Sequence, residues 1–197
     1  MFIQPPMEHR IAEVVESSSA VFVAQCYELY ETPPLGTVVR AGENPITYGV
    51  IAKITTLGTD PTRRPVARGA AETNESAVYA NNPQLSRLLR TDFETVIVGY
   101  SDGANIKHYL PPIPPRIHAF VYTCPDEEVK HFMESLRFLE ALLLGGASDD
   151  SIAACLRQAS HLHGDTKVFL IRAGRELAEL LVGQLPRLQS ILRKLEN

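Results

Sequence analysis

The amino-acid sequence predicts an α+β protein that is mainly β in its first part and α-helical in its last part. Short segments rich in Val, Ile, Thr and Tyr, separated by Gly, Pro, Asn and Asp, continue as far as Tyr122. Residues 111–115 include four prolines, which exclude a helix interior or a central strand and indicate a stiff connector. After Pro125, apolar residues recur at helical spacing. We therefore divide the chain into a β region, residues 1–122, and a helical region, residues 123–197.

Four strands are expected in the first part of the β region. They cover residues 11–15, 21–29, 37–39 and 46–56, and Gly- and Pro-containing turns separate the later ones. Val21 and Val23 alternate with other residues, which indicates one buried face. Several short strands at this spacing favour a barrel or a sandwich, whose open edges would offer surface to a protein partner.

The second part of the β region begins with a loop. Residues 58–80 have little apolar content and are expected to form a mobile surface loop. Leu85, Leu88 and Leu89 recur at i, i+3 and i+4 behind Pro83, so we expect one short inserted helix with Asn82 as its N-cap. Strand-forming residues return at 93–100, 106–110 and 119–122.

Three helices are expected after Pro125. The first covers residues 126–143 and stops at two glycines, and the second follows the capping residues 148–150. The third begins near Asp165 and is kinked or restarted at Pro186. A stripe of leucines advances along it by three or four residues, and it either pairs with another helix or packs within its own bundle. Its members are Leu177, Leu181, Leu185, Leu188, Leu192 and Leu195.

The order of several short motifs resembles a known family, the HAS barrel. They lie at residues 11–18, 35–39, 48–51, 58–61 and 110–115, before a connector that ends at residues 126–128. The HAS barrel is the N-terminal domain of HerA-type hexameric DNA translocases and is similar to the N-terminal barrel of ATP synthase subunits. The resemblance covers roughly residues 10–129 and implies a small antiparallel barrel of five to seven strands.

The chain departs from those translocases in the part that follows the barrel. Their ATPase holds nucleotide phosphates with a GxxxxGK[ST] loop, whereas this sequence contains no Gly-Lys dipeptide. A helical region of about 70 residues also leaves no room for a parallel ATPase sheet with its helices. The resemblance therefore implies the docking or assembly role of the barrel without the motor.

We accordingly expect a non-enzymatic adaptor that acts through protein–protein contacts. Its partner is expected to be a second copy of the chain, or a ring-shaped ATPase or nuclease of a DNA-processing complex, as the resemblance implies. Proline-rich tracts and amphipathic helices are common recognition elements. The candidate partner-binding residues are Pro111, Pro112, Ile113, Pro114, Pro115, Leu188, Leu192 and Leu195.

An alternative function is weak binding of nucleic acid. Five arginines in and after the predicted loop would contact phosphates in a salt-sensitive way, although they lack the interleaved aromatic residues of a strand-binding groove. They are Arg63, Arg64, Arg68, Arg87 and Arg90. The net charge of −4 does not indicate a strongly basic nucleic-acid binder.

Metal and thiol chemistry have poor support in the sequence. Cys155, His161, His163 and Asp165 come closest to a metal-binding set, but their spacing does not match a structural zinc site. Cys124, with His118 and His131 nearby in sequence, could be a thiol nucleophile activated by imidazole. Its flanking residues match no known nucleophile motif, so we expect a buried core cysteine. We expect no catalytic residue, no metal and no cofactor.

The composition indicates where the protein is found. It is 45% apolar and 21% charged, as in ordinary globular proteins, and its apolar runs are too short to span a bilayer. Residues 1–6 lack the charged and apolar regions of a secretory signal. Three widely separated cysteines fit reduced thiols. We therefore expect a cytoplasmic protein without a membrane span.

Overall fold

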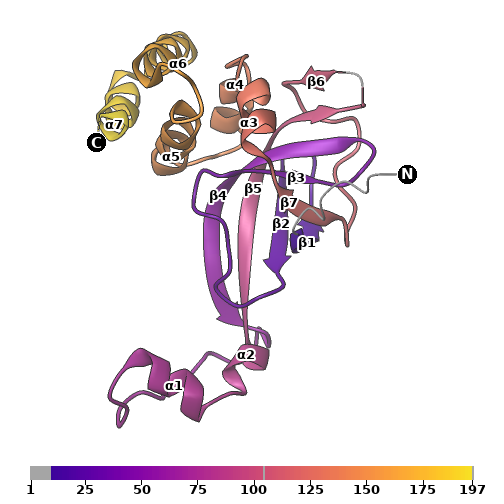
Figure 1. Ribbon diagram of the computed structural model, residues 1–197, viewed down its shortest axis with the longest axis vertical. Helices are drawn as coiled ribbons and strands as arrows, with labels where there is room; N and C mark the ends of the chain where they lie inside the picture. The colour runs from indigo at the N-terminus through magenta and orange to yellow at the C-terminus, as the bar shows by residue number, and fades with distance from the viewer. Residues whose placement is uncertain (1–9, 104, 197) are drawn as a thin grey trace.

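The computed structural model of the chain describes residues 10–103 and 105–196. It confirms the α+β class: an antiparallel sheet of seven strands forms a near-barrel ring, and helices follow it (Figure 1). The residues on which we based the expectation of no secretory signal lie outside the described part. Within that part, no helix has both the length and the hydropathy needed to cross a membrane.

The ring closes because its first and last strands in space pair with each other. The order around it is β1, β7, β3, β4, β5 and β2, and the β2–β5 pairing completes the circle, while β6 extends the sheet from β5. Each ring strand thus has two neighbours within the ring, so the open edges that we expected as partner surface are not found in the ring itself. The strands are β1 (Arg10–Ser17), β2 (Val21–Cys26), β3 (Val38–Ala41), β4 (Ile46–Gly58), β5 (Leu89–Ser101), β6 (Ile106–Lys107) and β7 (Phe120–Thr123).

The interior of the ring is filled by alternate residues of its strands. Three alanines, Ala12, Ala24 and Ala41, contribute little volume there, and Phe22 and Phe93 occupy the space they leave. This exchange of small and large side chains is how a narrow barrel reaches close packing. In β2 the interior residues are Phe22, Ala24 and Cys26, so the predicted strand is present, but its buried face is the opposite one to that of Val21 and Val23.

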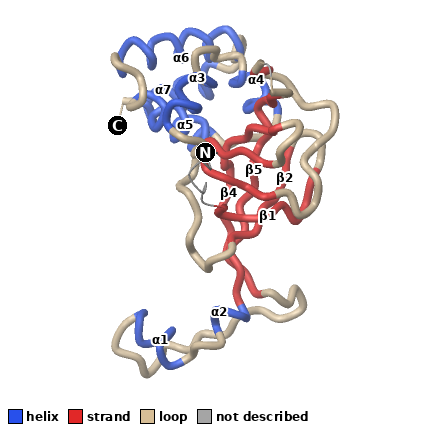
Figure 2. The backbone as a smooth tube through the Cα atoms, turned by 45° about the vertical axis from the view of Figure 1, so that its right-hand side comes forward, coloured by secondary structure: helices blue, strands red, loops and turns tan. Residues whose placement is uncertain are grey.

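β4 and β5 extend beyond the ring as a two-stranded arm (Figure 2). Residues 59–88 join them, with α1 (Glu75–Asn81) and α2 (Leu85–Leu88). We call residues 59–88 the arm tip.

One short helix was predicted in the arm tip, starting after Asn82, but the described tip has two. The side chain of Asn74 accepts a hydrogen bond from the Ala77 N–H at 2.9 Å and starts α1, while Asn82 ends that helix. Leu89 pairs with Gly58 in the sheet and so leaves the predicted helix.

The predicted first and third helices are each divided in two. The helices after the barrel are α3 (Asp126–Phe132), α4 (Phe138–Leu144), α5 (Asp149–Ser160), α6 (Thr166–Leu180) and α7 (Leu185–Leu195). Between α3 and α4, His108 hydrogen-bonds the Phe132 carbonyl at 2.8 Å and Arg172 donates to the Glu134 carbonyl at 2.8 Å. Both carbonyls would otherwise accept helical hydrogen bonds. The other division precedes Pro186, which restarts the helix at its first turn as expected.

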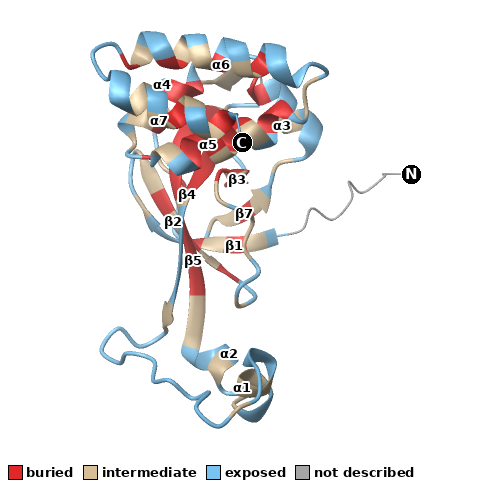
Figure 3. Cartoon of the chain, turned by 90° about the vertical axis from the view of Figure 1, so that its left-hand side faces the viewer, coloured by how far each residue is buried: buried red, intermediate tan, exposed pale blue. Residues whose placement is uncertain are grey.

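The helices cover one end of the barrel and share a core with it (Figure 3). Val96 and Val98 of β5, with Tyr48 of β4, belong to the same buried cluster as Phe132 and Phe138. Glycines allow the closest approaches: a side chain at Gly36, where φ is +86°, would run into the backbone of α5 at Ala154 and Cys155.

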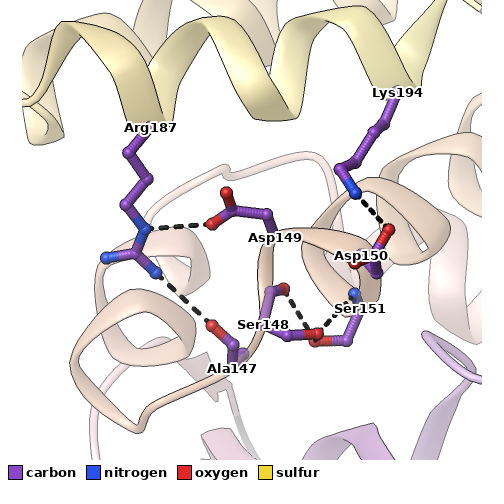
Figure 4. Close-up of polar contacts among 7 residues, drawn as sticks. All are labelled: Ala147, Ser148, Asp149, Asp150, Ser151, Arg187 and Lys194. Carbon is purple, nitrogen blue, oxygen red and sulfur yellow. Dashed lines mark hydrogen bonds and ion pairs between the residues drawn. The ribbon is translucent and has the colours of Figure 1, made fainter.

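α7 is held against the start of α5 by charged side chains (Figure 4). Arg187 donates from Nε to Asp149 at 3.0 Å and from a terminal nitrogen to the Ala147 carbonyl at 3.4 Å. About two turns further along α7, Lys194 pairs with Asp150. The two aspartates also lie in the first turn of α5, where negative charge is favourable.

Candidate functional site

The proline tract runs across the outside of the barrel between β6 and β7. We call residues 108–119 the strap. Pro111 and Pro115 are buried, and Ser17 Oγ donates to the Pro115 carbonyl at 2.6 Å. Pro112 is exposed, and Ile113 is 66% exposed. The tract is therefore anchored at both ends and presents its middle outward.

A cleft of about 470 Å³ lies beside the strap. One wall is formed by the strap, including Ile113, Pro114 and Ile117, and the other by the turn before β4, including Asn44 and Pro45. Apolar side chains with a few polar groups line it, which is the usual character of a recognition cleft. Three of the predicted partner-binding residues, Ile113, Pro114 and Pro115, thus line a real depression in the surface.

The outer face of β7 adds aromatic groups to one side of this cleft, and arginines of the neighbouring strands β1 and β3 lie against them. Phe120 and Tyr122 both line the cleft. The Arg10 guanidinium lies 4.3 Å from the centre of the Phe120 ring, and that of Arg40 lies 5.7 Å from the Tyr122 ring. Arginine and aromatic side chains are enriched at protein interfaces.

Sequence reasoning did not include these four residues. The alternation of Phe120 and Tyr122 indicates one common strand face, but the arginines join them only through strand pairing: Arg10 and Arg40 both stand opposite Tyr122 in neighbouring strands. Near them, His118 pairs with Glu13, and this hydrogen bond holds the pKa of the Glu13 carboxyl below its usual value.

The three predicted leucines do not join the strap. Leu195 is buried, and Leu188 and Leu192 pack against the core that the helices share with the barrel. Of the two alternatives for the leucine stripe, packing within its own bundle is the one that the structure shows for these three residues.

The five arginines of the nucleic-acid alternative are spread along the arm and are partly paired. Arg63 lies 3.5 Å from Asp60, Arg90 lies 3.0 Å from Asp92, and Arg68 donates to Asn82 at 3.4 Å. The arm tip holds four arginines against one aspartate and two glutamates. The net charge of the arm tip is therefore close to neutral.

The residues considered for a metal or thiol site serve other contacts. Asp165 caps α6 by accepting the Val168 N–H at 3.0 Å, and the His163 ring stacks on Phe169 with 4.3 Å between ring centres. Burial raises the pKa of the Cys155 thiol to about 12, which keeps it protonated and unreactive. No group of three metal-binding side chains occurs among residues 10–103 and 105–196.

Cys124 and Cys155 both line a small pocket of about 140 Å³ between the barrel and α5. The two histidines named with Cys124 are engaged elsewhere: His118 pairs with Glu13, and His131 lies 3.3 Å from Glu134. The structure therefore does not bring these histidines to the thiol as bases.

No protein-family model matches this chain, and no curated protein has a similar sequence. Of the features that the HAS-barrel resemblance implies, the structure shows an antiparallel sheet that closes in a ring.

Proposed function

We propose that this protein is a non-enzymatic adaptor that binds a protein partner through the strap and the cleft beside it. The observation that carries the proposal is the exposure of apolar side chains on an anchored, stiff segment. Tyr109, Leu110, Ile113 and Ile117 are all exposed on the strap, and two of them line the cleft. Exposed apolar groups that gather beside a cleft are typical of binding surfaces.

The anchoring of the strap favours binding. Pro111 and Pro115 are buried at its two ends, and the His118 N–H donates to the Val14 carbonyl at 2.9 Å. A segment that is already held in one conformation loses little entropy when a partner docks on it. Arg10, beside Phe120, adds a cation that is able to fix the orientation of an extended partner segment.

The class of partner follows from the resemblance to the HAS barrel. We propose a ring-shaped ATPase or a nuclease of a DNA-processing complex, because such barrels occur as docking domains of hexameric translocases.

The experiment is site-specific photo-crosslinking in cells. A photoreactive amino acid replaces Ile113 in the strap, and in a matched control it replaces Val66 in the arm tip, which is 76% exposed. We expect one crosslinked protein, a ring ATPase or nuclease, from position 113 only. The crosslink should disappear when Ile117→Asp is added, because a carboxylate would enter the apolar cleft wall. Equal capture from both positions, or capture that Ile117→Asp leaves unchanged, contradicts the proposal.

The nucleic-acid alternative predicts a different result. Binding of labelled single-stranded DNA would fall steeply with salt and would weaken on Arg64→Ala and Arg87→Ala. The adaptor proposal predicts no such binding. A salt-sensitive complex lost in those two variants would favour the alternative and count against the strap.

A further inference from the structure

A second interaction surface lies on α6, away from the strap and the arm. This helix forms the outermost layer of the helical region, at the end of the molecule opposite the arm tip (Figures 1 and 3). Its inner side is buried through Phe169, Ala173 and Leu177. Its outer side has no covering element among the described residues, as its exposed side chains show.

The outer side of α6 has the spacing of a helix-pairing seam. Val168, Ile171, Arg175 and Ala178 are all exposed, and they follow one another by steps of three and four. Val182, directly after the helix, is 80% exposed. Steps of three and four place side chains in one stripe along a helix, which is the arrangement found where two helices pair.

The charges beside this stripe are ordered along the helix. Lys167 and Arg175 lie in the first two-thirds and Glu176 and Glu179 in the last part, all without a side-chain hydrogen bond or ion pair to the described residues. Lys167 stands in the first turn and Glu179 in the last. Apart from the N-cap Asp165, this order opposes the helix dipole, which favours acids at the start and bases at the end.

This order of charges destabilises α6 as an isolated helix. It favours an antiparallel neighbour whose basic residues also come first and whose acidic residues come last. In that arrangement the basic part of each helix lies against the acidic part of the other, whereas a parallel pairing would bring like charges together. A twofold axis near Leu177 brings Arg175 of each copy beside Glu179 of the other, so this pair forms twice, since a twofold interface is self-complementary.

We propose that two copies of this chain associate through antiparallel packing of their α6 helices. Ile171 of one copy lies against the partner's Val182, and Arg175 lies against the partner's Glu179. The small Ala178 near the axis lets the two helices approach closely. This inference goes beyond the adaptor function and does not depend on it, because the strap and α6 are separate surfaces.

α6 is a single helix of 15 residues, so the interface is small and the dimer is expected to dissociate on dilution. Sedimentation velocity of the full chain over about 10 µM to 1 mM, a range suited to small interfaces, should show a concentration-dependent dimer. A monomer throughout this range overturns the proposal.

Charge reversal tests the orientation of the two helices. Arg175→Glu or Glu179→Arg alone should weaken the dimer about tenfold, because each change creates two repulsive contacts across the axis. The double variant R175E/E179R should restore the dimer, since it exchanges the two charges. Arg64→Glu in the arm tip is the matched control and should leave association unchanged.

The apolar part of the seam is tested separately with Ile171→Asp, which places a carboxylate in the middle of the stripe. All of these positions are exposed, and the urea unfolding midpoint of each variant verifies that it folds. Loss of the dimer in Ile171→Asp supports the proposal. A dimer that survives Ile171→Asp and both single reversals uses another surface and overturns it.

Discussion

Arg187 on α7 donates from Nε to Oδ1 of Asp149 on α5 across 3.0 Å, and this contact joins the last helix to the start of α5, 38 residues upstream of Arg187 (Figure 4). The same guanidinium reaches the Ala147 carbonyl. Since α5 packs on the barrel, the pair connects the end of the chain to its core.

Loss of the Arg187 side chain should lower the free energy of unfolding by about 1 kcal/mol, because a half-buried ion pair and a charged hydrogen bond are lost together. Arg187→Met keeps most of the apolar stem and isolates this effect. Lys194→Met removes the neighbouring pair with the more exposed Asp150 and should cost less than half as much. Urea unfolding compares the two, and an equal cost would contradict the assigned role of Arg187.

Gly36→Ala should destabilise the protein by about 3 kcal/mol, because the added methyl group meets the α5 backbone in addition to straining a positive φ. Gly146→Ala is the matched control. Gly146 has φ of +85° but no atom within 4 Å of its Cβ position, so only the backbone strain of about 1 kcal/mol applies. Equal losses in urea unfolding would show that the contact with α5 is not tight.

A hydrogen bond between two tyrosines joins the arm tip to the loop between β2 and β3. The Tyr79 and Tyr30 hydroxyls are 2.6 Å apart, and this hydrogen bond raises the pKa of Tyr79 to about 12. Tyr79→Phe should speed tryptic cleavage after Arg63 and Arg68 by about 2- to 5-fold, because local opening of the tip becomes easier. Mass spectrometry of early fragments measures this rate.

Tyr109→Phe, on the strap, is the control for the tyrosine experiment and should leave cleavage of the arm tip unchanged. If Tyr79→Phe also has no effect, the contact with Tyr30 does not restrain the tip.

Two buried thiols should make stability depend on pH in the alkaline range. Burial raises the pKa of Cys26 to about 11 and that of Cys155 to about 12. Because these pKa values are raised by folding, the contribution of the neutral thiols is fully present below the unfolded thiol pKa of about 8.5 and is lost as pH rises toward the folded values. The free energy of unfolding should therefore fall from pH 8.5 upward.

Cys155→Ala isolates the larger part of this effect. The variant is less stable at neutral pH because it leaves a small cavity, but its stability should decline less steeply above about pH 8.5 than that of the native chain. Urea unfolding at several pH values gives both slopes. Identical slopes would show that Cys155 is not the group responsible.

Much of the architecture follows from local patterns in the sequence. Alternation around Val21 and Val23 predicted β2, and Pro186 predicted the restart at α7, and the structure contains both. The prolines at 111–115 predicted a segment outside helices and strands, which the structure places between β6 and β7 and not between the barrel and the helices. Such signals act over a few residues, through backbone restriction and side-chain period. They do not require knowledge of what packs against them.

The candidate sites could be predicted only in part for the same reason. Residues 113–115 lie in a tract with an unmistakable composition, and three of the predicted residues do line the cleft. Arg10 and Arg40 join Tyr122 only because their strands are its neighbours in the closed ring. A pairing between segments more than 80 residues apart leaves no local mark on either segment.

The sequence by itself determined the α+β class, most of the strands and the proline tract that the structure places between β6 and β7, because these depend on short-range steric preferences and on the spacing of apolar residues. Only the tertiary structure decided that the ring closes, that the helix after Pro125 is interrupted where His108 and Arg172 take its carbonyls, and that Leu188, Leu192 and Leu195 of α7 pack inward while one side of α6 stays uncovered. Each of these depends on which distant groups compete for the same hydrogen bond or the same apolar surface, and that competition is resolved only when the whole chain packs.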